Sequence, residues 1–187
     1  MRPIPRKTAY RILYGNLIAA ALLVSLAAAG AIRRHHRFDA LLLAAGQKHQ
    51  VDPRLLSAVV WKESTYNPQA LGAAGEVGLM QIMEGALTDW KRTHSRQDVS
   101  REDLWDPAFN VEVGTWYLAR AIRHWQEAGS RDPLPFALAE YNAGRSRARA
   151  WAQAGGLEAD DFIAAIEFSS TRRYVRDILK RYRGRAP

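Results

Sequence analysis

The chain has 187 residues and a formal net charge of +8, with an ordinary apolar content for a globular protein. It contains no cysteine, which excludes a disulfide framework, a cysteine-ligated zinc site, a catalytic thiol and a lipid-bearing lipoprotein cysteine. The positive charge favours an anionic partner such as nucleic acid, anionic lipid or an acidic polymer.

Residues 1–37 are predicted to form an export segment. Basic residues precede an uncharged run from Ile12 to Ile32, and a second basic cluster follows this run. This order is typical of an export signal, for which Ala27-Ala28-Ala29 offers a cleavage site. The run is also about long enough to span a bilayer as an uncleaved N-terminal anchor, which we favour. A buried core helix is the remaining alternative. Both export interpretations place residues 38–187 on the periplasmic side of the inner membrane.

Residues 38–187 are predicted to form one all-α domain of roughly six to eight helices. Asp52 before Pro53 is an N-cap followed by proline in the first turn, and it begins a helix that ends at Glu63-Ser64. A glycine-rich loop follows, with a small hairpin or irregular turn at residues 70–78. The other expected helices are Phe38–Gln50, Val77–Trp90, Asp106–Ala128, Pro133–Tyr141, Arg145–Gln153, Asp160–Ile166 and Ser170–Tyr182.

Glu63 continues an apolar stripe that Leu56 and Val59 begin at helical spacing. It lies in the last turn of its helix, near the negative end of the helix dipole. Desolvation and this dipole both disfavour the ionised form, so we expect the pKa of Glu63 to be raised. A carboxylic acid that stays protonated near neutral pH suits a general acid. From this helix alone, a solvated glutamate at a fraying helix end is the alternative.

Four segments, beginning with the one that contains Glu63, resemble one family in their order and spacing. They are Glu63-Ser64 with Gly78-Leu79-Met80-Gln81, Gly114-x-x-Tyr117-Leu118, Ala139-Glu140-Tyr141-Asn142-Ala143-Gly144, and Thr171-Arg172-Arg173-Tyr174-Val175. Together they resemble the catalytic domain of the soluble lytic transglycosylases, the goose-type-lysozyme-like SLT family. The resemblance covers about Leu41 to Leu179.

The resemblance implies a lysozyme-like helical domain with the glycine-rich loop in the active-site cleft. It implies that Glu63 is the sole acid/base and cleaves the β-1,4 bond between N-acetylmuramic acid and N-acetylglucosamine in peptidoglycan. Glu63 would protonate the glycosidic oxygen and then deprotonate the C6 hydroxyl of the same muramoyl residue, closing a 1,6-anhydro ring. No water attacks, so the second carboxylate of ordinary glycosidases is not required.

The same resemblance implies a set of substrate-binding residues. Ser64 would bond the substrate or only the backbone, and Gly78 would permit close approach of the sugar or only a tight turn. Met80 would pack on a sugar face or fill the core. Tyr141 would bond Glu63 or the substrate, or lie in the core with its hydroxyl satisfied. The set is Ser64, Gly78, Leu79, Met80, Gln81, Tyr141, Asn142 and Tyr174. Gln81 and Tyr141 are expected to converge on Glu63, and Asn142 is foremost a turn or helix-end residue, with site lining secondary.

The sequence also departs from the family pattern. Glu84 and Glu167 stand where proline is common, and Ser170 stands where an acidic residue is common. Glu140 stands where a small residue is common, and it adds a second carboxylate near the expected cleft. It either points away from the sugar or pairs with an arginine, or else it tunes Glu63 or orients a water, which would favour hydrolysis.

Two other functions compete with a lytic transglycosylase: a muramidase of the same fold that hydrolyses with water, and a non-catalytic module for wall binding or assembly. A DNA-binding protein is disfavoured because no helix carries a base-reading pattern.

The five histidines lack metal-ligand spacing, so no metal and no cofactor are expected. The expected partners are peptidoglycan strands and, through the N-terminal segment, the cytoplasmic membrane, with no nucleic acid. The sequence leaves the oligomeric state open.

Overall fold

The computed structural model describes residues 14, 16, 20–25, 30 and 36–184, and the chain divides into two compact units, Met1–Phe38 and Asp39–Pro187. Most of the predicted export segment, including Ala27-Ala28-Ala29, lies outside the described residues. In the part of the chain that the structure describes, no helix combines the length and the apolar character needed to cross a bilayer.

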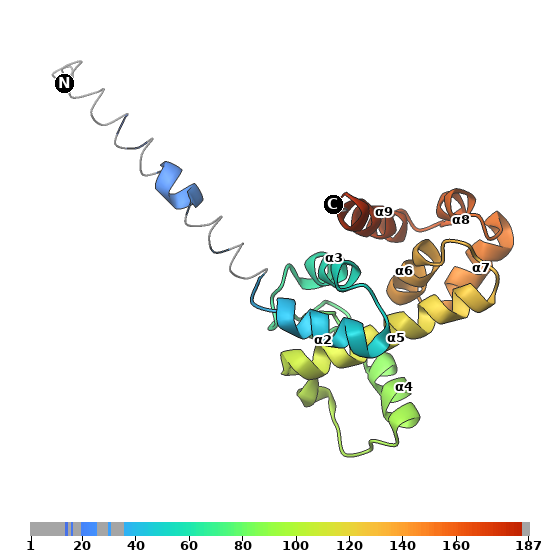
Figure 1. The fold of residues 1–187 in the computed structure, drawn as a ribbon, viewed down its shortest axis with the longest axis horizontal. Helices are drawn as coiled ribbons and strands as arrows, with labels where there is room; N and C mark the ends of the chain where they lie inside the picture. The colour runs from blue at the N-terminus through green and yellow to red at the C-terminus, as the bar shows by residue number, and fades with distance from the viewer. Residues whose placement is uncertain (1–13, 15, 17–19, 26–29, 31–35, 185–187) are drawn as a thin grey trace. The chain divides into compact units, whose positions relative to one another are not determined.

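The second unit is helical throughout its described residues, apart from two isolated β-bridges, as the sequence predicts (Figure 1). Its elements are α2 (Asp39–His49), α3 (Pro53–Ser64), α4 (Glu84–His94), the 3₁₀ helix η1 (Arg101–Trp105), α5 (Pro107–Glu127), α6 (Leu134–Ala143), α7 (Arg145–Gly155), α8 (Ala159–Ala165) and α9 (Ser169–Arg183).

Helix α3 forms for the local reasons expected. Asp52 caps its first turn by accepting a hydrogen bond from the Arg54 amide at 2.8 Å, and Pro53 occupies the first position. Leu56 and Val59 are fully buried. The helix ends at Ser64 because Thr65 adopts a left-handed conformation with φ 51°, three residues before the proline at 68. Glu63 therefore lies in the last turn, as predicted.

The predicted helix Val77–Trp90 is wrong over its first half. Helix α4 begins only at Glu84, and the preceding residues form an irregular loop closed by bridges from Val77 to Leu71 and to Ile82. The buried side chain of Asn110, on α5, forms hydrogen bonds with backbone groups of this loop. Its Oδ1 accepts from the Met80 amide at 2.8 Å, and its Nδ2 donates to the Val77 carbonyl at 2.8 Å. The loop's buried backbone groups are thus paired without a helix.

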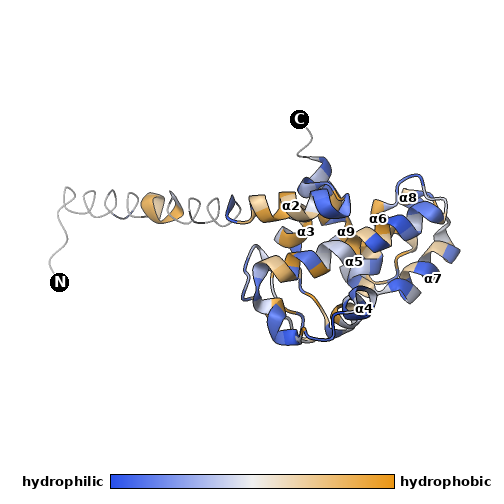
Figure 2. Cartoon of the chain, turned by 60° about the horizontal axis from the view of Figure 1, so that its bottom comes forward, coloured by the Kyte–Doolittle hydropathy of each residue, from blue (hydrophilic) through white to orange (hydrophobic). Residues whose placement is uncertain are grey.

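The remaining helices enclose one core and bring distant segments together. α5 is capped by Asp106, whose side chain accepts from the Phe109 amide, and it packs against α2, α4 and α6. Phe136 of α6 and Phe162 of α8 are fully buried and stack at 3.9 Å. α9 packs against both α6 and α3. Its C-terminal end is hydrophilic (Figure 2). This return of α9 to α3 positions the site described next.

Candidate active site

Glu63 is partly buried between α3 and α9. The Tyr174 hydroxyl of α9 donates a hydrogen bond to Glu63 Oε1 at 2.5 Å. The pKa of Glu63 is raised from its ordinary value of 4.5 to about 7, chiefly by burial and to a smaller extent by the negative charge of Glu76. The Tyr174 hydrogen bond and the Lys62 charge oppose this rise. The direction agrees with the sequence prediction, and burial, which disfavours the ionised form, is its main cause.

Three of the predicted site residues hold the loop beside Glu63. The Ser64 hydroxyl donates to the Leu79 carbonyl at 2.9 Å, and the Tyr141 hydroxyl donates to the Met80 carbonyl at 2.8 Å. The Gln81 amide donates to the Ala70 and Gly78 carbonyls at 3.1 and 3.0 Å. Among the hydrogen bonds of the described residues, the expected one from Tyr141 to Glu63 is absent. The Tyr141 hydroxyl donates to the loop instead, and the Tyr174 hydroxyl donates to the Glu63 carboxylate.

The other loop residues of the predicted set face inward. Leu79 and Met80 are fully buried, and a side chain at Gly114 would come within 2.6 Å of Met80 Sδ. The Met80 side chain therefore fills the core, and its carbonyl accepts the hydrogen bond from Tyr141. Gly78 has φ 78°, and a Cβ there would lie 2.3 Å from Asn110 Nδ2. Only glycine fits this position, because both the backbone conformation and the space exclude a side chain.

A cavity of about 520 Å³ opens beside this loop, between α4, α6 and α7. Gln81, Tyr141 and Asn142 of the predicted set line it. Asn142 Oδ1 also accepts from the Thr171 hydroxyl at 2.8 Å, which fixes it to the start of α9. The cavity is lined by Gln81, Ile82, Met83, Gly85, Ala86, Asp89, Tyr117, Glu140, Tyr141, Asn142, Ala143, Gly144 and Arg147.

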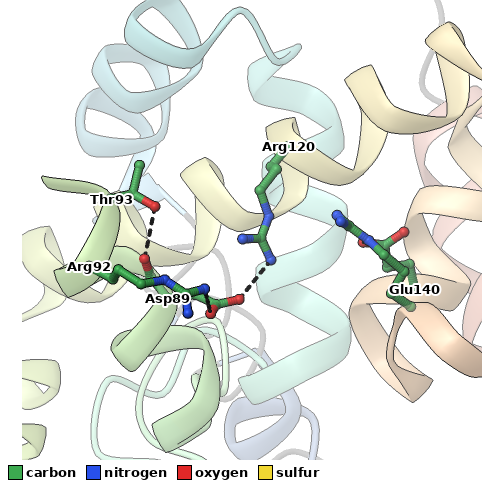
Figure 3. A network of polar contacts seen from close by, with 6 residues as sticks. Asp89, Arg92, Thr93, Arg120 and Glu140 are labelled. Atoms are coloured by element: carbon green, nitrogen blue, oxygen red, sulfur yellow. Dashed lines mark hydrogen bonds and ion pairs between the residues drawn. The ribbon is translucent and has the colours of Figure 1, made fainter.

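The two carboxylates on the cavity wall are both held by arginines. Glu140 is 1% exposed and accepts from Arg145 Nε at 2.7 Å and from the Trp125 indole at 2.9 Å, so the predicted arginine pair is confirmed. Asp89 of α4 pairs with Arg120 of α5 at 3.0 Å, as Figure 3 shows. Among the described residues, no cluster of three or more histidine and acidic side chains is placed to hold a metal ion.

The model of the Transglycosylase SLT domain family matches residues 40–162. The chain belongs to this family. The soluble lytic murein transglycosylase of Escherichia coli K12 is 38% identical over 125 residues, which are 65% of this chain and 19% of that protein. Membrane-bound lytic murein transglycosylase C of Salmonella typhimurium is 37% identical over 89 residues, 46% of this chain and 25% of the relative.

Solved structures agree with the family. The 70 kDa soluble lytic transglycosylase of Escherichia coli has a TM-score of 0.67 at 33% identity, over 79% of this chain and 24% of that one. An inactive mutant of the lytic transglycosylase Slt of Pseudomonas aeruginosa has a TM-score of 0.66 at 30% identity, over 76% and 23%. This SLT domain thus has the all-α, lysozyme-like fold predicted, and the chain spans about a quarter or less of the length of these relatives.

Sequence reasoning missed part of the cavity of this SLT domain. Tyr117 belongs to a recognised motif but had no role assigned; its ring meets Tyr141 edge-on at 5.9 Å on the cavity wall. Met83, within the segment predicted as the first half of a helix, is 50% exposed and lines the cavity. Asp89 and Arg147 carried no motif signal. Their placement follows from how α4 and α7 pack, which no local pattern specifies.

Proposed function

We propose that this chain is a peptidoglycan lytic transglycosylase in which Glu63 is the sole acid/base. The observation that carries the proposal is the Glu63 carboxyl, with a pKa of about 7, hydrogen-bonded to Tyr174 at the end of α3. A carboxyl with this pKa is available in both protonation states near neutral pH, which a group acting as acid and then as base requires. The names of the relatives support murein as the substrate.

The proposed reaction conserves the proton. Protonated Glu63 donates its proton to the glycosidic oxygen as the bond from this oxygen to the muramoyl C1 breaks. The resulting carboxylate accepts the proton of the C6 hydroxyl of the same muramoyl residue, and the C6 oxygen bonds to C1. The products are a strand with a free 4-hydroxyl and a strand with a 1,6-anhydro end. Holding the nucleophile within the substrate gives the reaction the advantage of proximity.

The state of the second carboxylate supports ring closure over hydrolysis. Glu140 is held by Arg145 and Trp125, so it is not available to activate a water. One observation favours the alternative, a muramidase of the same fold: the negative charge of a further carboxylate, Glu76, acts on Glu63. Its Oε2 accepts a hydrogen bond from the Ala74 amide at 3.0 Å.

Product analysis separates these functions. Purified peptidoglycan is digested with the wild type and with Glu63→Gln, and the fragments are analysed by mass spectrometry. We expect 1,6-anhydro ends from the wild type and at least about a 100-fold loss of cleavage from Glu63→Gln. Reducing ends without anhydro ends would establish the muramidase instead. Unchanged activity of Glu63→Gln would remove Glu63 from the mechanism, and no cleavage by the wild type would favour a non-catalytic wall-binding module.

We also propose how the segments around the site are used. The glycine-rich loop at residues 70–83 forms a wall of the substrate cleft, and Gln81, Tyr141 and Asn142 contact the glycan. Residues 1–37 carry residues 38–187 across the cytoplasmic membrane and hold them at its periplasmic face, because basic residues flank an uncharged run. Membrane fractions washed with alkaline carbonate test this attachment: we expect the full chain to stay with the membrane, and its release would show that the segment is not an anchor.

A further inference from the structure

The cavity beside the loop at residues 70–83 has three charged side chains on its wall: Asp89, Glu140 and Arg147. Asp89 pairs with Arg120 at 3.0 Å and with Arg92 at 2.8 Å (Figure 3). Glu140 is buried in its pair with Arg145. Both carboxylates are therefore compensated within the protein, and neither presents a free negative charge to a ligand.

Arg147 differs from these two residues. Its side chain is exposed at the start of α7, and no ion pair found among the described residues includes it, whereas Arg145, two positions earlier, pairs with Glu140. It is nonetheless held in place, since Nη1 donates to the Ala143 carbonyl at 3.1 Å and the guanidinium lies 5.3 Å from the centroid of the Phe168 ring. Phe168 is 44% exposed and packs edge-on against Trp151. A guanidinium has five N–H donors, so most of its donors face the cavity or solvent.

We propose that Arg147 binds a carboxylate of the peptide stem that a muramoyl residue carries. This rests on the proposed function, since peptidoglycan strands bear short peptides that end in free carboxylates. A planar guanidinium binds a carboxylate through two parallel hydrogen bonds. The position of Arg147 at the rim fits a group that projects from the glycan, and Asp89 and Glu140 do not repel it because their charges are already paired.

The test compares two forms of one substrate. Peptidoglycan is used as prepared and after its carboxylates are converted to neutral amides with a carbodiimide and methylamine. Cleavage is measured as the release of soluble fragments. We expect the wild type to cleave the native form about tenfold more efficiently than the amidated form, the size of one charge-assisted hydrogen bond. Arg147→Gln is expected to cleave both forms at the rate at which the wild type cleaves the amidated one.

Two further variants make the result specific. Arg149→Gln is the matched control, because Arg149 is an exposed arginine on the same helix that contacts His124 and does not line the cavity; it should keep the full preference. Arg147→Lys should keep part of it, since lysine retains the charge without the planar fork. Equal cleavage of both forms by the wild type, or the same loss of preference in Arg149→Gln, would overturn the proposal. If neither form is cleaved at all, the proposed function itself has failed.

Discussion

Tyr174 donates a hydrogen bond of 2.5 Å to Glu63 Oε1 and so joins two residues that lie 111 positions apart in the chain. The contact exists because α9 packs against α3. It stabilises the ionised form of a carboxyl whose burial favours the neutral form. The two largest influences on the pKa of Glu63 therefore oppose each other, and a single substitution removes one of them.

Replacing Tyr174 with phenylalanine should raise the pKa of Glu63 above 7. The substitution removes the hydrogen bond that lowers this pKa and leaves the burial that raises it. The loss of one charge-assisted hydrogen bond corresponds to a rise of about one unit. Since the proposed acid must be protonated, the fall in cleavage rate at high pH should move upward by the same amount. The measurement is the pH dependence of fragment release.

Tyr182→Phe is the matched control for this experiment. Tyr182 lies on the same helix and also donates to a carboxylate, that of Asp52 at 3.0 Å, but Asp52 caps the far end of α3. This variant should leave the high-pH limb where it is. A Tyr174→Phe limb that coincides with that of the wild type would mean that Glu63 is not the group whose titration limits the rate.

Glu63→Gln should stabilise the fold at neutral pH. The folded protein has a Glu63 pKa of about 7 against an ordinary value of 4.5, so between these values the folded state binds more protons than the unfolded state. The free energy of unfolding of the wild type therefore falls as pH rises through this window, whereas neutral glutamine adds no such dependence. The variant's advantage should be near zero below pH ~4.5 and reach up to about 3 kcal/mol above pH ~7. Urea unfolding across pH measures it, and a difference that is constant with pH would contradict the assigned pKa.

The local parts of the site could be predicted from sequence. The cap at Asp52, the apolar stripe and the carboxylate in the last turn of α3 depend on residues within a few positions of one another, and all were confirmed. The segment from Val77 to Met83 could not be predicted in this way. Leu79 and Ile82 are buried as their spacing suggests, but the backbone that carries them is paired with Asn110, about thirty residues later.

Asn110 should therefore be among the most sensitive polar residues of the domain. It is fully buried and pairs with the Met80 amide and with the Val77 and Leu104 carbonyls. Asn110→Ala leaves the Met80 amide without its partner and removes a hydrogen bond from the Leu104 carbonyl and from the Val77 carbonyl, which keeps its bond from the Ile82 amide. We expect a loss of about 3 kcal/mol in the free energy of unfolding. Asn67→Ala is the comparison, because exposed Asn67 makes one bond, to the Gln69 amide, and should cost less than about 1 kcal/mol. Similar losses in the two variants would show that Asn110 does not support the loop.

The tyrosines show the same limit of sequence reasoning. Tyr141 and Tyr174 were both expected at the site, yet which of them reaches Glu63 depends on how α6 and α9 pack. In the structure the Tyr141 hydroxyl donates a hydrogen bond to the Met80 carbonyl, and the Tyr174 hydroxyl donates one to the Glu63 carboxylate. The family resemblance pointed to both side chains, and only the packing of helices distant in sequence assigned their hydrogen-bond partners.

Glu140→Gln tests whether the second carboxylate takes part in the chemistry. Glu140 is 1% exposed and its charge is paired with Arg145. A neutral side chain leaves this guanidinium without its counter-ion, and we expect the free energy of unfolding to fall by about 3 kcal/mol. The products should remain 1,6-anhydro fragments and the pH dependence of cleavage should not move, because Glu140 only holds the wall of the cavity.

Arg145→Gln should destabilise to a similar extent, and the double variant by less than the sum, since both changes remove one pair. A Glu140→Gln protein of full stability that has lost its activity would instead make Glu140 a participant in the reaction, and would reopen hydrolysis as the mechanism.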